Sequence, residues 1–256
     1  MLDDSLAEAY AVLGDMARVD RKWTEAKAYY LRAIASEPKN STAHLWYGEH
    51  LLSVGHTRDA LEETLIAYRL DPLHPSTNNE LARTYLRLGD TSNVLKYGAA
   101  AWDLGAPVGL WVQAEANWRV GEFERAMEFM EQWAEQVGDF SFRVPLKLVY
   151  EAKMDAAKRP LFFETVAENE SALGPFFVLW FYAAFDRIDD VYRMLKLAPD
   201  SIDGSDCDVF WLNDLAAFRQ DPRFTDLMTE LGLVDYWREH GWPDACQPAG
   251  DSVICE

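Results

Sequence analysis

Apolar and small residues recur along the first half of the chain at an interval of 34 residues. Small residues keep this interval at Gly14 and Gly48, at Ala26 and Ala60, and at Ala33, Ala67 and Ala101. Large apolar residues keep it at Leu13, Tyr47 and Leu81, and prolines at Pro38 and Pro72. Because several independent positions share one period, the sequence predicts a repeated structural unit.

Each period predicts two helices joined by a short turn, because apolar positions within it follow helical spacing. The predicted pairs are 5–19 with 23–36, 42–54 with 57–70, 76–88 with 91–104, and 108–120 with 123–137. Gly55, Gly89 and Gly121 mark turns within pairs, and the fourth period is two residues short. Pro38 is expected to stop a helix, and Asn40 or Ser41 to cap the next one.

The small residues are expected to let the two helices of a pair approach closely. Large side chains such as Tyr30, Leu51 and Tyr85 would fill the volume that remains. One pair cannot bury its apolar face alone, so successive pairs must stack.

The repeated residues resemble the tetratricopeptide repeat (TPR). In the first frame the resemblance lies in Leu13-Gly14, Trp23, Ala26, Tyr30, Ala33 and Pro38. It implies an all-α fold, a right-handed α-solenoid of stacked helix-turn-helix pairs with a C-terminal helical cap. The third frame departs from the pattern at Val94 and Gly98, which predicts looser packing there.

The pattern weakens after residue 140, which sets the expected division of the chain. Residues 1–140 are predicted to form four TPR-like pairs. Residues 141–200 would continue the solenoid as degenerate pairs, 145–157 with 161–169 and 175–185 with 188–198, or form a non-repeat helical extension. Residues 201–256 are expected to form a helical cap and tail.

The C-terminal segment has its own sequence features. Asp221-Pro222 predicts the start of a helix over 223–231. Large apolar side chains would then cover the open end of the solenoid, as terminal repeats require: Phe224, Leu227, Leu231, Tyr236 and Trp237. This ending also resembles the close of TPR arrays in bacterial winged-helix transcriptional regulators and TPR-containing nucleotide cyclases.

Charge excludes two classes of partner. The chain has 24 Lys and Arg against 43 Asp and Glu, a formal charge of −19. Nucleic acids and anionic membrane surfaces both bind clustered basic residues, so neither is expected as a partner. The longest apolar run, 175–185, is too short to span a membrane.

The expected compartment is the cytoplasm, because the N-terminus lacks the apolar stretch of a signal peptide. The periplasm is the alternative, if the chain is the sensor part of a membrane-anchored regulator. Cys207, Cys246 and Cys255 do not make a disulfide framework, and one bridge among them stays open.

The sequence contains no motif that predicts catalysis. Phosphate loops, GxSxG elbows and HExxH motifs are absent from the sequence. His240, Cys246 and Cys255 fall short of the four ligands of a zinc site. We therefore expect no enzyme, no metal and no cofactor.

The resemblance implies a concave groove lined by the first helix of each pair, and places ten candidate binding residues there. They are Asp15, Arg18, Glu49, Asn79, Arg83, Arg87, Trp111, Glu115, Trp118 and Arg119. Arginine and asparagine hold carboxylates or backbone, and tryptophan supplies apolar contact area. A peptide anchored between Arg83 and Trp118 is one hypothesis. In the alternative, the tryptophans pack against the next repeat and the arginines pair with Glu49, Glu80 or Glu115.

Together these features predict a protein-interaction module with a regulatory or signalling role, which binds a protein or peptide segment in its groove. The alternative is a small-ligand sensor domain of a bacterial regulator. A homodimer through residues 141–200 is left open.

Overall fold

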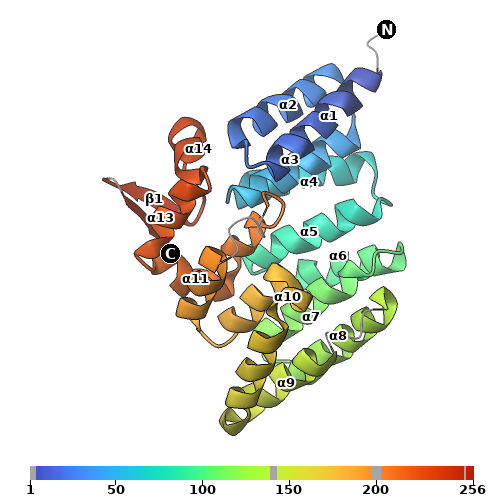
Figure 1. The fold of residues 1–256 in the computed structure, drawn as a ribbon. Coiled ribbons are helices and arrows are strands. Elements are labelled where there is room, and N and C mark those ends of the chain that lie inside the picture. The colour runs from blue at the N-terminus through green and yellow to red at the C-terminus, as the bar shows by residue number, and fades with distance from the viewer. Residues whose placement is uncertain (1–3, 139–142, 198–202, 251) are drawn as a thin grey trace.

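The computed structural model describes residues 4–138, 143–197, 203–250 and 252–256, and begins with four stacked helix pairs (Figure 1). The pairs are α1 (Asp4–Val19) with α2 (Trp23–Ser36), α3 (Ser41–Ser53) with α4 (Thr57–Leu70), α5 (Pro75–Leu88) with α6 (Thr91–Asp103), and α7 (Val108–Arg119) with α8 (Phe123–Val137). Each predicted helix is present to within one residue at either end. The prediction of an all-α solenoid is confirmed.

Local sequence explains where these helices begin and end. The side chain of Asn40 accepts a 3.0 Å hydrogen bond from the backbone N–H of Ala43, as an N-cap residue does. Asp90 caps α6 in the same way, through the N–H of Asn93. At Gly89, which ends α5, φ is 75°, a conformation that favours glycine.

Close contact within a pair depends on its small residues. A Cβ placed on Gly14 would lie 2.7 Å from Cε1 of Tyr30, which leaves no room for a side chain. Ala26 and Ala60 are completely buried where the second helix of each pair meets the first. Replacing any of these residues by a larger one would therefore force the helices apart.

The third pair is not loosened at Gly98, contrary to the expectation from the sequence. A Cβ on Gly98 would lie 2.9 Å from Cγ of Gln113, and one on Gly109 would collide with the carbonyl oxygen of Gly98. The two glycines therefore bring α6 and α7 into close contact, and Val94 is fully buried nearby.

Three further helices follow the pairs: α9 (Arg143–Met154), α10 (Arg159–Ala183) and α11 (Ile188–Leu197), with a short 3₁₀ helix, η2 (Ala156–Lys158), before α10. The predicted helices 161–169 and 175–185 are two halves of α10, which is kinked at Gly174. This glycine has φ 75° and ψ 160°, outside the helical region. The end of the predicted helix 188–198 lies outside the described residues.

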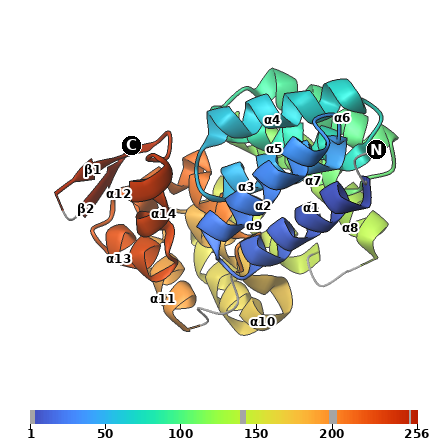
Figure 2. The same ribbon diagram turned by 90° about the horizontal axis from the view of Figure 1, so that it is seen from above.

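The chain then returns along the stack instead of extending it. The return contains the 3₁₀ helices η4 (Cys207–Trp211) and η5 (Asn213–Leu215), then α12 (Ala216–Gln220), α13 (Arg223–Glu230) and α14 (Leu233–His240). Figures 1 and 2 show these elements beside the pairs, where α14 contacts α2 and η4 contacts α3. The aromatic cap was expected to cover the open end of the solenoid, whereas it packs along the stack against the first pairs.

The chain ends in a small antiparallel hairpin, β1 (Cys246–Ala249) with β2 (Ser252–Cys255). These strands were not predicted, since a helical cap and tail were expected over residues 201–256.

One hydrophobic cluster connects the return to the repeats. It contains Trp23 of the first pair, Leu81 of the third, Trp118 of the fourth and Trp237 of α14. The return is therefore part of the main core. Among the described residues, no helix is long and apolar enough to cross a membrane.

Candidate functional site: the concave wall and the segment along it

The first helices of the pairs, α1, α3, α5 and α7, lie side by side and form the concave wall. Asp15, Glu49, Arg83 and Glu115 occupy the same position in successive pairs. The first three are partly exposed, with side-chain exposures of 38%, 21% and 28%. Glu115 is buried. At this position the first three pairs thus present partly exposed polar side chains, whereas the side chain of the fourth pair is buried.

Residues 203–244, here called the return segment, cover the part of the wall formed by the C-terminal ends of these helices. Asp208 accepts a 2.6 Å hydrogen bond from Nη2 of Arg83 and a further one from Nη2 of Arg87. Arg119 donates through Nε to Asp214 over 3.0 Å. The chain's own carboxylates thus pair with three arginines that were candidate binding residues, Arg83, Arg87 and Arg119.

Three buried tryptophans connect the return segment to the first two pairs. Trp211 donates its indole N–H to the backbone oxygen of Ser53 at 3.1 Å, and Trp237 donates to that of Val54 at 2.8 Å. In the opposite direction, Trp23 donates to the backbone oxygen of Leu231 at 2.8 Å. Each bond satisfies a buried indole that would otherwise pay a desolvation cost.

A buried histidine lies at the centre of this contact. His50 is completely buried and its Nε2 lies 3.2 Å from the hydroxyl of Tyr236. Burial holds the pKa of His50 well below its usual value, and nearby positive charges lower it further. The ring is therefore neutral at physiological pH, which suits a site without a carboxylate partner.

Burial also raises the pKa values of several carboxyl groups on the wall. Burial raises the pKa values of Glu80 and Glu115, and it raises that of Glu49 to about 7. Arg18 bridges Asp15 at 2.6 Å and Glu49 at 3.3 Å. Arg18 thus connects the first two pairs, and burial disfavours the charged form of the carboxyl groups on the wall.

The two tryptophans of the predicted site lie in the core. Trp118 packs edge-on against Phe123, with ring centres 4.9 Å apart, and against Trp180 of α10. Trp111 packs against the rings of Trp180 and Phe177. They belong to the contact between α7 and α10, as the alternative interpretation of the sequence expected for these residues.

The remaining predicted residues differ in whether a partner could reach them. Asn79 is half-buried on the wall near Arg83, whereas Arg87 and Arg119 face the return segment. Arg83 also pairs with Glu80 at 3.1 Å. The accessible part of the predicted groove is therefore the surface around Asp15, Glu49, Asn79 and Arg83.

The comparisons with known proteins agree with the repeat geometry. Residues 12–55 match the profile of the Tetratricopeptide repeat family. The TPR repeat-containing thioredoxin TTL4 of Arabidopsis thaliana is 35% identical over 75 residues, which are 29% of this chain and 11% of that protein. The similarity thus covers about a tenth of the length of this relative. The residues that match the family profile lie in α1 to α3, and the stacked helix pairs have the arrangement of a TPR solenoid.

Sequence reasoning missed the residues that the return segment brings to the TPR stack, above all Asp208 and Asp214. They lie in an acidic stretch of a strongly acidic chain, where no single carboxylate stands out. One signal was available: the run Cys207–Trp211 is mostly apolar, which predicts burial, and Asp208 within it then requires a buried partner.

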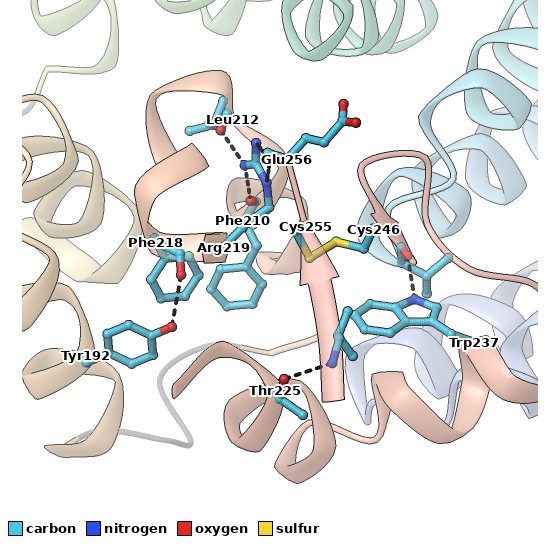
Figure 3. Close-up of a disulfide and its surroundings, with 12 residues drawn as sticks. Tyr192, Phe210, Leu212, Phe218, Arg219, Thr225, Trp237, Cys246, Cys255 and Glu256 are labelled. Carbon is cyan, nitrogen blue, oxygen red and sulfur yellow. Dashed lines mark hydrogen bonds between the residues drawn. A yellow bond between two sulfur atoms is a disulfide. The ribbon is translucent and has the colours of Figure 1, made fainter. Parts of the chain in front are cut away.

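The end of the return is fixed by the hairpin, which Figure 3 shows with its surroundings. Cys246 and Cys255 form a disulfide across the two strands, and Cys207 is free and buried. Arg219 donates to the backbone oxygens of Phe210, Leu212 and Glu256. One guanidinium group thus connects η4, the residue between η4 and η5, and the residue that follows β2.

A cavity of ≈ 820 Å³ lies between α11, α13 and the turn after α1. Tyr192, Phe210 and Leu227 contribute apolar surface to it, and Arg223 lies over the Tyr192 ring at 4.3 Å. Arg223 is paired with Asp189 at 2.8 Å. The cavity has the size and the mixed lining of a small-molecule site.

Proposed function

We propose that the chain is a protein-interaction module that binds a segment of a partner protein on the accessible part of its concave wall. One observation carries the proposal: Asp15, Glu49 and Arg83, equivalent residues of successive repeats, keep partly exposed side chains on that wall. A row of charged groups at a regular spacing is suited to an extended segment with complementary charges. Residues 1–140 would supply the binding repeats, residues 141–200 their support, and residues 201–256 the cap.

The structure changes how such a segment would be anchored. Trp118 is buried against α10, so it offers no contact area to a partner. Asn79 and Arg83 are half-buried and lie on the same face of α5. We therefore infer that they, rather than an Arg83–Trp118 pair, hold the partner segment.

Site-specific photo-crosslinking tests this proposal. A photoreactive amino acid at Asn79 is expected to crosslink a protein from the native extract. The same amino acid at Glu62, which is exposed on α4 away from the wall, serves as the control. A crosslinked band at both positions, or at neither, would count against binding on the wall.

The role is proposed to be regulatory, because the C-terminal segment resembles the ends of TPR arrays in bacterial regulators. Self-association through residues 141–200 stays a prediction, which sedimentation at several concentrations tests.

The cavity beside α11 favours a second candidate, a small-ligand sensor. In this case a metabolite would bind between Tyr192, Phe210 and Leu227, and stabilise the contact of the return segment with the repeats. A metabolite that raises the melting temperature of the wild type, and not that of a Leu227→Trp variant with a filled cavity, would support it.

A further inference from the structure

One side of α1 exposes a row of apolar side chains. Leu13 is 40% exposed, Met16 61% and Val19 38%. Residues three apart lie on neighbouring positions of one helix face, so the three side chains form a continuous stripe. We call these three residues the α1 stripe.

The equivalent residues of the next two repeats are buried. Leu13 corresponds to Tyr47 (8% exposed) and Leu81 (0%). The counterparts of Met16 and Val19 are at most 7% exposed: His50, Thr84, Ser53 and Arg87. The α1 stripe therefore has the position of an interface between repeats, yet its three side chains stay 38–61% exposed in the described structure.

The second repeat shows what covers this face elsewhere. Helix α2 lies against α3, and the Tyr30 ring is 6.1 Å from Tyr47 and 5.7 Å from His50. Trp23, seven residues earlier on α2, has its ring 6.2 Å from His50. The cover is thus a helix that places two large aromatic rings seven residues apart.

A small residue completes the fit. Ala33 of α2 and Ala43 of α3 are fully buried in one cluster. The counterpart of Ala43 on α1 is Ala9, which is exposed. A covering helix can therefore approach α1 as closely as α2 approaches α3.

We propose that the α1 stripe binds an amphipathic helix of a partner protein, with an apolar face like that of α2. Such a helix would present two bulky rings to Leu13 and Met16, and a small residue to Ala9. Glu8 and Asp20 are exposed beside the stripe, so basic residues along the edges of the bound helix would match them. A second copy of the chain fits less well, because its own stripe carries no aromatic ring. This site is separate from the concave wall and does not depend on the function proposed for it.

A peptide with the sequence of residues 22–37, stapled on its solvent-facing side and labelled, provides the probe. Fluorescence anisotropy with the full chain is expected to show saturable binding. Met16→Glu should weaken binding by about tenfold or more, because it buries a charge in the contact. Met154→Glu is the matched control, since Met154 is 59% exposed on α9. An Ala33→Leu change in the peptide should also weaken binding.

Absence of binding to the wild type, or equal binding to the Met16→Glu variant, would overturn the proposal. Sedimentation velocity of the chain alone tests whether a second copy of the chain occupies the stripe instead. Self-association that Met16→Glu abolishes would assign the stripe to a second copy and would also overturn it. Circular dichroism of both variants should confirm that the fold is unchanged.

Discussion

Trp23 and Leu231 are 208 residues apart in the sequence, yet the Trp23 indole donates a 2.8 Å hydrogen bond to the backbone oxygen of Leu231. Trp23 begins the second helix of the first repeat, and Leu231 follows α13 near the end of the chain. The return segment thus brings the end of the chain to its first repeat. The repeats form the concave wall, and the return segment covers part of it.

Asp208 is expected to be the most important carboxylate for stability. It is 2% exposed and accepts hydrogen bonds from Arg83 and Arg87, so Asp208→Ala leaves a buried guanidinium unpaired. We expect a loss of about 3–5 kcal/mol in the free energy of unfolding, measured by urea denaturation. Asp214→Ala is the matched control, because its carboxylate is 36% exposed and its loss should stay below about 1 kcal/mol. Equal losses for both variants would contradict this account of the wall.

Trp118 and Arg83 should differ sharply when each is replaced. Trp118→Ala removes a buried ring from the contact of α7 with α10, and should cost about 3–5 kcal/mol of stability. Arg83→Lys keeps a positive charge beside Glu80 and Asp208 at a half-buried position, and should cost much less. Thermal or urea unfolding of the two single variants decides this. A stable Trp118→Ala variant would show that this tryptophan is not a core residue.

Acidification should weaken the protein through His50. Its pKa in the folded chain lies below the unfolded value near 6.5, so below that pH the unfolded state binds the proton that the folded state excludes. Stability should therefore fall as pH drops from about 6.5, by up to about 1.4 kcal/mol per pH unit from this residue. The charged or titratable groups whose charge acts on it are Arg18, Lys27, His56 and His240.

Replacing His50 isolates its share of this dependence. His50→Phe keeps a ring of similar shape and should flatten the stability profile between pH 6.5 and 5. The measurement is urea denaturation across that range for both proteins. If the two slopes are the same, His50 is not the group that titrates.

The disulfide predicts a thiol count. The unfolded, unreduced chain should show one reactive thiol, that of Cys207, and three after reduction. Closing the short loop between Cys246 and Cys255 should contribute about 2–3 kcal/mol to stability. Reduction of the wild type and a Cys246→Ser, Cys255→Ser variant should lower the unfolding free energy equally. Disulfides persist in oxidising compartments, so three thiols in unreduced protein would instead favour the cytoplasm.

The repeats could be predicted from the sequence because their determinants are local. The 34-residue interval, the turn glycines and caps such as Asn40 act within one helix pair, and each pair repeats the same solution. The path after residue 200 depends instead on contacts across the whole chain, such as Trp211 with Ser53 and Asp208 with Arg87. No interval in the sequence encodes these pairings.

The candidate site shows the same division. The resemblance to the TPR implied that Asp15, Glu49 and Arg83 lie on one wall, because equivalent positions of stacked pairs share a surface. Access to each residue was not predictable, since it depends on where α10 and the return segment pack. Trp118 and Arg87 were therefore predicted in the groove but lie under other parts of the chain.

The contact between Trp23 and the return segment is the most direct test of the fold described here. In a sample with labelled tryptophan indoles, assigned with a Trp23→Phe variant, nuclear magnetic resonance should show slow solvent exchange of the Trp23 indole N–H. It should also show a nuclear Overhauser effect from the Trp23 ring to Gly232, because a Cβ placed on Gly232 would lie 3.7 Å from Cδ1 of Trp23. Rapid exchange of the Trp23 indole N–H without that effect would mean that the concave wall is open and that the return segment lies elsewhere.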